Sequence, residues 1–280
     1  GQARHVAADA GTRFAGITTS AGPVDMASLV AGTQDLVEDL RAEKYTDVAN
    51  AHGWRVLPGQ ASFAGTPEAP VLEVRGPEGG VGVVEAAHYL IATGARAWTP
   101  PIEGLADVGY LTSTTAMELS HVPDSLLVLG GGYVAVELAQ LFARLGSTVT
   151  MLVRSRLASK EEPEVSTALE AVFADEGIRV VRRAQVQRMT RDQPTGQVVA
   201  TASVAGAARQ YRADEVLVAL GRRPVTQWLN LGAVGVRTGT VGEVTVTDRL
   251  QSSNPRVFAS CYVTGYPEFV YVAARHGQIV

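Results

Sequence analysis

The sequence has a single cysteine, Cys261, among its 280 residues. One cysteine forms no disulfide within the chain and provides no dithiol pair, so a disulfide-stabilised secreted scaffold is excluded and a reducing cytoplasmic compartment is favoured. Long apolar runs are also lacking. The longest covers residues 126–136 and ends at Glu137, well short of the ~20 residues that cross a bilayer. The sequence therefore predicts a protein without a membrane span.

Neither sign of charge is in large excess. The chain has 28 acidic and 24 basic residues, for a net charge of −4, which gives no electrostatic reason to expect a nucleic-acid partner. The five histidines show no metal-ligand spacing, so we expect no metal site. The first residues form no signal peptide and include no initiator methionine, so the sequence is expected to begin partway through a longer chain.

The pattern of apolar residues predicts two kinds of organisation. Helical spacing predicts one long amphipathic helix from Val24 to about Asn50. Short β-rich runs within residues 54–85 predict a meander, and a buried strand ends at Thr93-Gly94. From residue 125 onward, strands alternate with helices and short links, which predicts a parallel sheet with an antiparallel insert at residues 185–213. The predicted parallel strands are residues 125–129, 148–153, 178–181 and 215–220, with helices after Gly132 and from Pro163.

The sharpest motif follows the strand at residues 125–129. It reads Gly130-x-Gly132-x-x-Ala135 and opens an amphipathic helix. Gly130 permits a tight turn, Gly132 lets a pyrophosphate approach the backbone, and Ala135 lets helix and strand pack closely. The helix N-terminus presents N–H groups to the phosphates. We therefore predict a dinucleotide site here, with a purely structural glycine turn as the alternative.

The choice of dinucleotide depends on the end of the second strand. An NAD enzyme usually has an acidic residue there, whereas this chain has Val153 followed by Arg154, Arg156 and Lys160. Guanidinium groups make charge-assisted hydrogen bonds to a 2′-phosphate, so we predict NADP(H). The alternative is a solvated loop whose cations are offset by nearby glutamates. Five further arginines are expected on solvated strand faces: Arg179, Arg182, Arg183, Arg188 and Arg191.

With these residues the chain resembles the flavin-dependent pyridine nucleotide–disulfide oxidoreductases, and within them the mercuric reductases. The resemblance covers nearly the whole chain and combines several short motifs in order. Besides the glycine turn they are Lys44-Tyr45, residues 59–63 (GQASF), Ala92-Thr93-Gly94 with residues 100–104, Thr112-Ser113-Thr114, residues 219–224 (ALGRRP), residues 257–264 and residues 267–274 (PEFVYVAA). The last run points to the mercuric reductases in particular.

The resemblance implies an α/β fold in which a doubly wound NAD(P)-binding domain is inserted in an incomplete FAD-binding domain of the glutathione-reductase type. The implied limits are 1–105 for the first part of the FAD domain, 106–248 for the NADP(H) domain and 249–280 for the second FAD part. It further implies that Gly221 and Arg222 contact the nicotinamide dinucleotide. The residues implied to approach FAD are Ala61, Thr93 and Gly94.

Two side chains near the glycine turn receive catalytic roles from the resemblance. Tyr133 resembles a gate that covers the flavin until nicotinamide displaces it, although it could equally be a partly buried aromatic residue without that role. Glu137 in the family pairs with a lysine that follows the redox cysteines. A glutamate one turn into an otherwise apolar helix also needs such a partner on general grounds.

The chain departs from the family pattern in four places. It lacks the opening FAD-binding strand and glycine loop, the CxxxxC redox pair with its lysine, and the C-terminal dimerisation domain, so we expect an internal fragment. Where the family has Ala-x-Gly-Asp for the ribityl chain, this sequence has Ala259-Ser260-Cys261-Tyr262. Cys261 lacks the backbone freedom of glycine, and Tyr262 is not a carboxylate. We expect Cys261 to be an inert buried residue and not a mercury ligand.

The resulting functional expectation is a cytoplasmic, homodimeric oxidoreductase. It passes electrons from NADPH through FAD and cysteine thiols to Hg(II), and these 280 residues alone are expected to be inactive. Two alternatives stay open: a related reductase of glutathione or dihydrolipoamide type, and a non-catalytic NADP-binding module.

Overall fold

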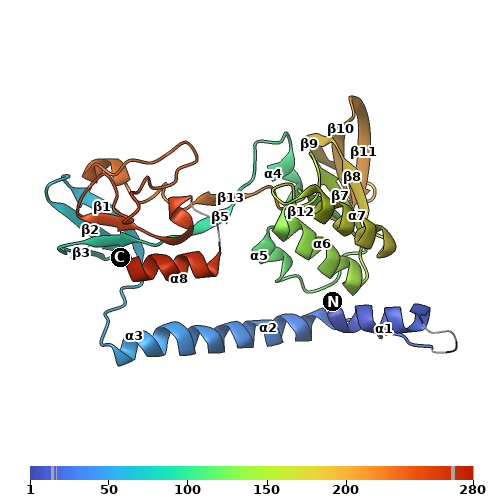
Figure 1. The fold of residues 1–280 in the computed structure, drawn as a ribbon, viewed down its shortest axis with the longest axis horizontal. Helices are drawn as coiled ribbons and strands as arrows, with labels where there is room; N and C mark the ends of the chain where they lie inside the picture. Colours follow the sequence, from blue (N-terminus) through green and yellow to red (C-terminus); the bar gives the residue numbers. More distant parts are fainter. Residues whose placement is uncertain (14–15, 17, 266–268, 280) are drawn as a thin grey trace. The chain divides into compact units, whose positions relative to one another are not determined.

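The computed structural model describes residues 1–13, 16, 18–265 and 269–279. Pro267 and Glu268 of the last family motif lie outside these residues. The chain folds as two compact units, one made of residues 1–40 and 97–221 and the other of residues 41–96 and 222–280 (Figure 1). These limits differ from the expected domain limits at 105/106 and 248/249, and the assignment of the expected domains to FAD and NADP(H) stays a prediction.

The first unit is built on a four-stranded parallel sheet with the order β12-β6-β7-β8. Its strands are β6 (Ser125–Leu129), β7 (Thr148–Val153), β8 (Arg179–Arg182) and β12 (Glu215–Val218). Because the strands are parallel, their carboxyl ends share one edge of the sheet, where Val153 of β7 is the register partner of Arg182 of β8. The parallel sheet expected from the sequence is confirmed.

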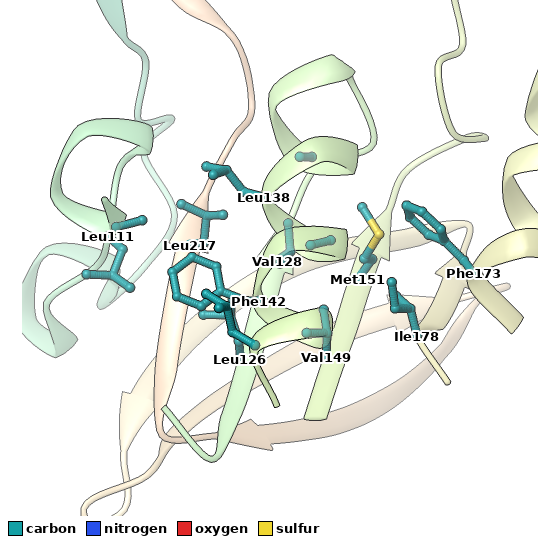
Figure 2. Close-up of a cluster of buried hydrophobic side chains, with 14 of the residues drawn as sticks. Leu111, Leu126, Val128, Leu138, Phe142, Val149, Met151, Phe173, Ile178 and Leu217 are labelled. Carbon is teal, nitrogen blue, oxygen red and sulfur yellow. The ribbon is translucent and has the colours of Figure 1, made fainter. Parts of the chain in front are cut away.

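One face of this sheet packs against two helices, α6 (Tyr133–Leu145) and α7 (Pro163–Asp175). Leu126 and Val128 of β6 and Met151 of β7 meet Phe142 of α6 and Phe173 of α7 in a fully buried cluster (Figure 2). Burial of such side chains contributes roughly 1.5–3 kcal/mol each. Val165 and Val172 of α7 are exposed.

The other face of the sheet packs against a three-stranded antiparallel sheet of order β11-β10-β9. Leu127 and Leu129 alternate with the residues of the helix-covered face, as expected for a strand, and join a cluster that includes Met189 and Tyr211. The strands are β9 (Ala184–Arg191), β10 (Val198–Val204) and β11 (Ala207–Ala213), and two short helices are α4 (Leu105–Val108) and α5 (Ser113–Ala116). The predicted antiparallel insert is confirmed.

The N-terminal residues are helical. They form α1 (Gln2–Arg13) and α2 (Met26–Arg41), and helical structure continues through η1 (Ala42–Thr46) and α3 (Asp47–Ala51). The long helix expected from Val24 to Asn50 is thus present, but its apolar face is covered only at its start: Met26 is buried, whereas Leu29 is 51% and Val37 46% exposed. Periodicity identifies an apolar face, but it does not say what packs on it.

The second unit contains an antiparallel meander of β1 (Gln60–Gly65), β2 (Pro70–Arg75) and β3 (Val81–Val84), which confirms the predicted meander over these residues. Residues 54–57, also expected to form a strand, do not form one, and Trp54 is exposed. The remaining elements are β4 (Tyr89–Ile91), β5 (Ala95–Ala97), β13 (Arg222–Pro224), η2 (Leu231–Val234), β14 (Val257–Ala259), η3 (Cys261–Thr264) and α8 (Val270–Ile279). β14 pairs with β4 in parallel, and β13 pairs with β5.

None of the helices in the described part of the chain is both long enough and apolar enough to cross a bilayer.

Candidate functional site

The turn between β6 and α6 requires glycine at its first position. Gly130 has a φ of +126°, and a Cβ atom added to it would lie 2.3 Å from the carbonyl oxygen of Ala219. Backbone hydrogen bonds fix this turn to both neighbouring strands. The Gly130 N–H donates to the carbonyl oxygen of Leu152 in β7 (3.1 Å), and the Ala219 N–H, which follows β12, donates to the carbonyl oxygen of Leu129 (2.9 Å). No larger residue fits without moving the backbone of β12 or β6.

Gly132, in contrast, is not required by the fold. Its φ of −79° is open to any residue, and no atom lies within 4 Å of an added Cβ, so neither strain nor packing requires glycine there. It is the N-cap of α6 and has no side chain to satisfy the first N–H groups of the helix. Ala135, fully buried, sets the close contact between α6 and the turn. The turn thus leaves free space beside unsatisfied amides, which is the geometry that binds a phosphate.

The loop after β7 is attached directly to this turn. The Ala158 N–H donates to the Gly131 carbonyl at 2.7 Å. Arg156 organises the same loop: its guanidinium donates to the carbonyl oxygens of Glu161 (2.6 Å) and Ser159 (3.2 Å) and to the hydroxyl of Ser166 (3.4 Å). These bonds fix where the loop lies relative to the glycine turn.

A hollow of about 470 Å³ opens beside this loop, and its lining residues are strongly basic. They are Arg154, Ser155, Arg156 and Ser159 from the loop together with Arg182 and Arg183 from the end of β8. The lining includes four guanidinium groups, two hydroxyl groups and no carboxylate. A surface of this chemistry suits a phosphate group.

The structure therefore brings together Arg154 and Arg156, two of the three cations expected to select NADP(H). Lys160 is exposed and is not one of the lining residues. Arg182 and Arg183 are exposed, as expected, and they also line the hollow. The signal in the sequence is their position at the carboxyl end of the third parallel strand, next to the end of β7.

Tyr133, the first residue of α6, is 47% exposed, and its hydroxyl donates to the carboxylate of Glu161. This hydrogen bond raises the pKa of the Tyr133 hydroxyl. Glu137, one turn further along α6, is exposed. The inference that burial in an apolar helix forces Glu137 to have a partner is therefore wrong, because its carboxylate is solvated.

The other expected nucleotide contacts lie where the sheet unit ends. Gly221 has a φ of +124° and no atom within 4 Å of an added Cβ. Arg222 is half-buried, and its guanidinium donates to the carbonyl oxygen of Ala95. Arg222 thus has a contact within its own unit.

The residues expected at FAD all lie in the second unit. Ala61 lies within the β1–β2 pair, and the Thr93 hydroxyl, which follows β4, donates to the Val225 carbonyl at 2.6 Å. Gly94 has a φ of +66° and open space around it. Cys261 also has a positive φ, of 67°, and its N–H donates to Nδ1 of the buried His276 at 3.0 Å.

Position 262 has a phenol in place of the carboxylate that the resemblance implies for the ribityl chain. Cys261 is half-buried, not fully buried as expected. Within the described ranges, no group of three or more His, Cys, Asp or Glu side chains is arranged to hold a metal ion.

Comparison with known families agrees with this geometry. Residues 4–277 match the family described as pyridine nucleotide-disulphide oxidoreductase. The chain belongs to this family. The family implies a flavin and a nicotinamide cofactor, and the predicted resemblance is confirmed.

The chain is similar along its whole length to proteins named mercuric reductase. It is 52% identical over 279 residues to the protein from Streptomyces lividans, covering 100% of this chain and 58% of that protein. It is 41% identical over 268 residues to the protein from Lysinibacillus sphaericus, covering 95% of this chain and 47% of that protein. The chain therefore spans about half the length of these curated relatives.

Solved structures share the fold. The HOCl-induced flavoprotein disulfide reductase RclA from Escherichia coli is 27% identical, with a TM-score of 0.79 over 92% of this chain and 60% of that chain. LpdA from Mycobacterium tuberculosis, 23% identical, has a TM-score of 0.85 over 99% of this chain and 60% of that chain. The predicted α/β fold of the glutathione-reductase type is confirmed.

Proposed function

We propose that this chain forms the NADPH-binding part of a flavin-dependent oxidoreductase that reduces Hg(II). The observation that carries the proposal is the basic hollow beside the glycine turn. A dinucleotide that rests its pyrophosphate on the amides at Gly132 has its adenosine ribose near the end of the second strand. That strand is β7, and its end opens onto Arg154 and Arg156. An anion on the ribose is favoured there, and the carboxylate typical of NAD sites is lacking.

The chain's own residues perform three tasks in this proposal. Amides of the first turn of α6 bind the pyrophosphate, Arg154 binds the 2′-phosphate, and Arg156 keeps the loop in place through its bonds to Ser159 and Glu161. The bound coenzyme supplies a hydride, which carries the two electrons that Hg(II) accepts. Lys160, exposed near the hollow, raises the local positive potential without contacting the phosphate.

Tyr133 and Glu137 act next to the reacting groups in the same proposal. Tyr133 lies at the N-terminus of α6 and is about half exposed, so its ring can move when a dinucleotide binds. The hydrogen bond to Glu161 holds the ring in one position until then. Glu137 projects into solvent from the next turn of α6, so its carboxylate is available to a lysine outside this chain.

Gly221 and Arg222 would contact the nicotinamide half, and Ala61, Thr93 and Gly94 would approach the flavin. The proposal assigns most of the flavin site, and the thiols that pass electrons to Hg(II), to other parts of a longer protein. We accordingly expect these 280 residues alone not to reduce Hg(II), and we expect the whole protein to be a cytoplasmic homodimer. The names of the relatives from Streptomyces lividans and Lysinibacillus sphaericus support the choice of Hg(II) as substrate.

The decisive experiment is a calorimetric titration of the chain with NADPH and with NADH. The proposal expects NADPH to bind at least about tenfold more tightly, since a charge-assisted hydrogen bond is worth roughly 1.5–3 kcal/mol. Arg154→Gln should remove most of this preference. Arg188→Gln is the matched control, because it removes the same charge at a residue that does not line the hollow. Nε of Arg188 lies 3.3 Å from Oε1 of Glu103. Equal affinities for the two coenzymes would refute NADPH selection.

A disulfide as the electron acceptor is the second candidate. The similarity to RclA, whose name describes a flavoprotein disulfide reductase, favours it. The two candidates share the NADPH site and differ in the acceptor. Oxidation of NADPH by the complete protein with Hg(II) or with oxidised glutathione as acceptor separates them, and we expect Hg(II) to be the better acceptor.

A further inference from the structure

Arg183 adopts an unusual backbone conformation at the edge of the hollow. It lies between β8 and β9 with a φ of +54°, in the left-handed region that favours glycine. Two other non-glycine residues of the same unit share this region, Ala158 (φ +43°) in the loop after β7 and Ala205 (φ +50°) between β10 and β11, while glycine occupies it at Gly177 (φ +75°) after α7. The conformation places an arginine in the lining of the hollow. Strained positions of this kind gather at binding sites.

The neighbouring residue, Arg182, is already engaged. Its Nε donates to the Ser155 carbonyl at 3.4 Å, and its Nη1 lies 3.5 Å from a carboxylate oxygen of Glu170. Arg182 thereby joins the end of β8 to the loop that carries Arg154. The Arg183 side chain, in contrast, is exposed and makes no hydrogen bond or ion pair with any of the described residues, and the same holds for the Arg154 side chain.

The four guanidinium groups of the hollow therefore fall into two pairs. Arg156 and Arg182 bind carbonyl oxygens of the loop and fix its shape. Arg154 and Arg183 reach the hollow from different strand ends and have no partner in the described protein. A phosphate monoester carries a charge of about −1.5 to −2 at neutral pH, so its charge is better matched by two free guanidinium groups than by one.

We propose that Arg183 is a specificity-determining residue that binds the 2′-phosphate of NADPH together with Arg154. The inference rests on the proposed NADPH function and extends it to a second strand end. Preference for the phosphorylated coenzyme is then shared by the loop after β7 and the turn after β8. With no partner among the described residues, the Arg183 side chain differs from Arg179 on β8 and Arg188 on β9, which each have a partner, the Tyr211 ring and Glu103.

The test uses 2′,5′-ADP, which carries the 2′-phosphate, and 5′-ADP, which does not. Both are titrated against the full chain and its variants Arg183→Gln and Arg154→Gln. Loss of one charge-assisted contact should weaken 2′,5′-ADP binding about tenfold or more and leave 5′-ADP binding within about twofold. Arg179→Gln, which removes the same charge from the neighbouring strand β8, should leave both affinities within about twofold.

A second variant separates binding from backbone strain. Arg183→Gly removes the guanidinium and also suits the positive φ, so the melting temperature should stay the same or rise while 2′,5′-ADP affinity falls as in Arg183→Gln. If both Arg183 variants bind 2′,5′-ADP like the unsubstituted chain while Arg154→Gln does not, the inference is wrong and the proposed function stands. If Arg154→Gln also binds 2′,5′-ADP like the unsubstituted chain, or if the unsubstituted chain binds no 2′,5′-ADP, both the inference about Arg183 and the proposed NADPH function are wrong.

Discussion

The N–H of Ala158 donates to the carbonyl of Gly131 at 2.7 Å, which attaches the arginine loop to the glycine turn. The two phosphate-binding regions proposed for the coenzyme are therefore parts of one connected structure. Gly131 itself allows this contact, since a Cβ there would lie 2.6 Å from a side-chain carbon of Val153. The loop can approach only because the middle residue of the turn has no side chain.

The two outer glycines of the turn should respond differently to alanine. Gly130→Ala forces a Cβ to within 2.3 Å of the Ala219 carbonyl at a φ of +126°, so we expect a loss of stability of about 3 kcal/mol or more. Gly132→Ala enters open space at an ordinary φ, so stability should change by no more than about 0.5 kcal/mol.

Nucleotide affinity provides the second measurement for this pair. The added methyl group of Gly132→Ala occupies the space where a pyrophosphate would approach the backbone, so NADPH affinity should fall by about tenfold or more although the fold is intact. Chemical denaturation and calorimetry measure the two effects. A Gly132→Ala protein that binds NADPH normally would show that the turn is structural only.

Arg156 should act through the loop. Arg156→Gln removes donors to the carbonyl oxygens of Glu161 and Ser159, so we expect a loss of about 1–2 kcal/mol of stability and a smaller preference for NADPH over NADH. Amide hydrogen exchange in residues 154–161 should become faster. Arg154→Gln, which breaks no such bond, should leave hydrogen exchange unchanged, and faster exchange in both variants would contradict the distinction.

The ion pair of Arg144 with Glu176 makes the first unit sensitive to acid. Nη2 of Arg144 lies 2.6 Å from Oε1 of Glu176, and both side chains are largely buried. The hydrogen bond from Arg144 holds the pKa of Glu176 below its ordinary value of 4.5. A lowered pKa means that the stabilisation is complete above pH 4.5 and is lost as the pH falls through the folded-state value.

Glu176→Gln should thus lower the free energy of unfolding by about 1–3 kcal/mol at pH 7. The difference from the unsubstituted chain should shrink steadily below pH 4.5. Denaturant unfolding at pH 7 and pH 3 measures it, with exposed Glu118→Gln as a control for charge. A difference that does not change with pH would contradict the assigned role of the carboxylate.

Ser125 and Asp214 connect the starts of β6 and β12. The Asp214 carboxylate accepts from the Ser125 hydroxyl (2.7 Å) and N–H (2.9 Å), and the hydroxyl bond is the main reason why the pKa of Asp214 is lowered. Ser125→Ala should cost about 1 kcal/mol of stability and raise the pKa of Asp214 toward its ordinary value. Carboxyl titration by NMR measures the pKa. Exposed Ser120→Ala should change neither quantity.

The sheet of the first unit could be predicted because its signals are local. An uncharged run bounded by Asp124 and Gly130 gives β6 with the observed limits, and Gly146 (φ +122°) marks the end of α6. The glycine turn could be predicted too, because strand, turn and helix are contiguous in sequence. The burial of the long N-terminal helix could not be predicted: Leu29 and Val37 lie on the same apolar face as the buried Met26, yet both are exposed.

The full basic hollow could not be predicted for a related reason. Arg154 and Arg156 follow the second strand directly, but Arg182 and Arg183 come from another strand end, and only the register of β7 with β8 brings them near. In the sequence they are exposed arginines at the end of a strand, which is typical of a solvated face. The prediction that Glu137 needs a partner assumed that its carboxylate is buried in the helix, whereas Glu137 is exposed. Position in a helix alone does not decide whether a carboxylate is buried.

The most direct test of the central claim is a crystal structure of this chain grown with NADPH. The proposal predicts the pyrophosphate on the amides at Gly132 and the 2′-phosphate in the hollow, with guanidinium nitrogens of Arg154 and Arg183 at about 2.7–2.9 Å from its oxygens. A coenzyme bound elsewhere, or bound at the turn with its 2′-phosphate directed away from these arginines, would contradict the account.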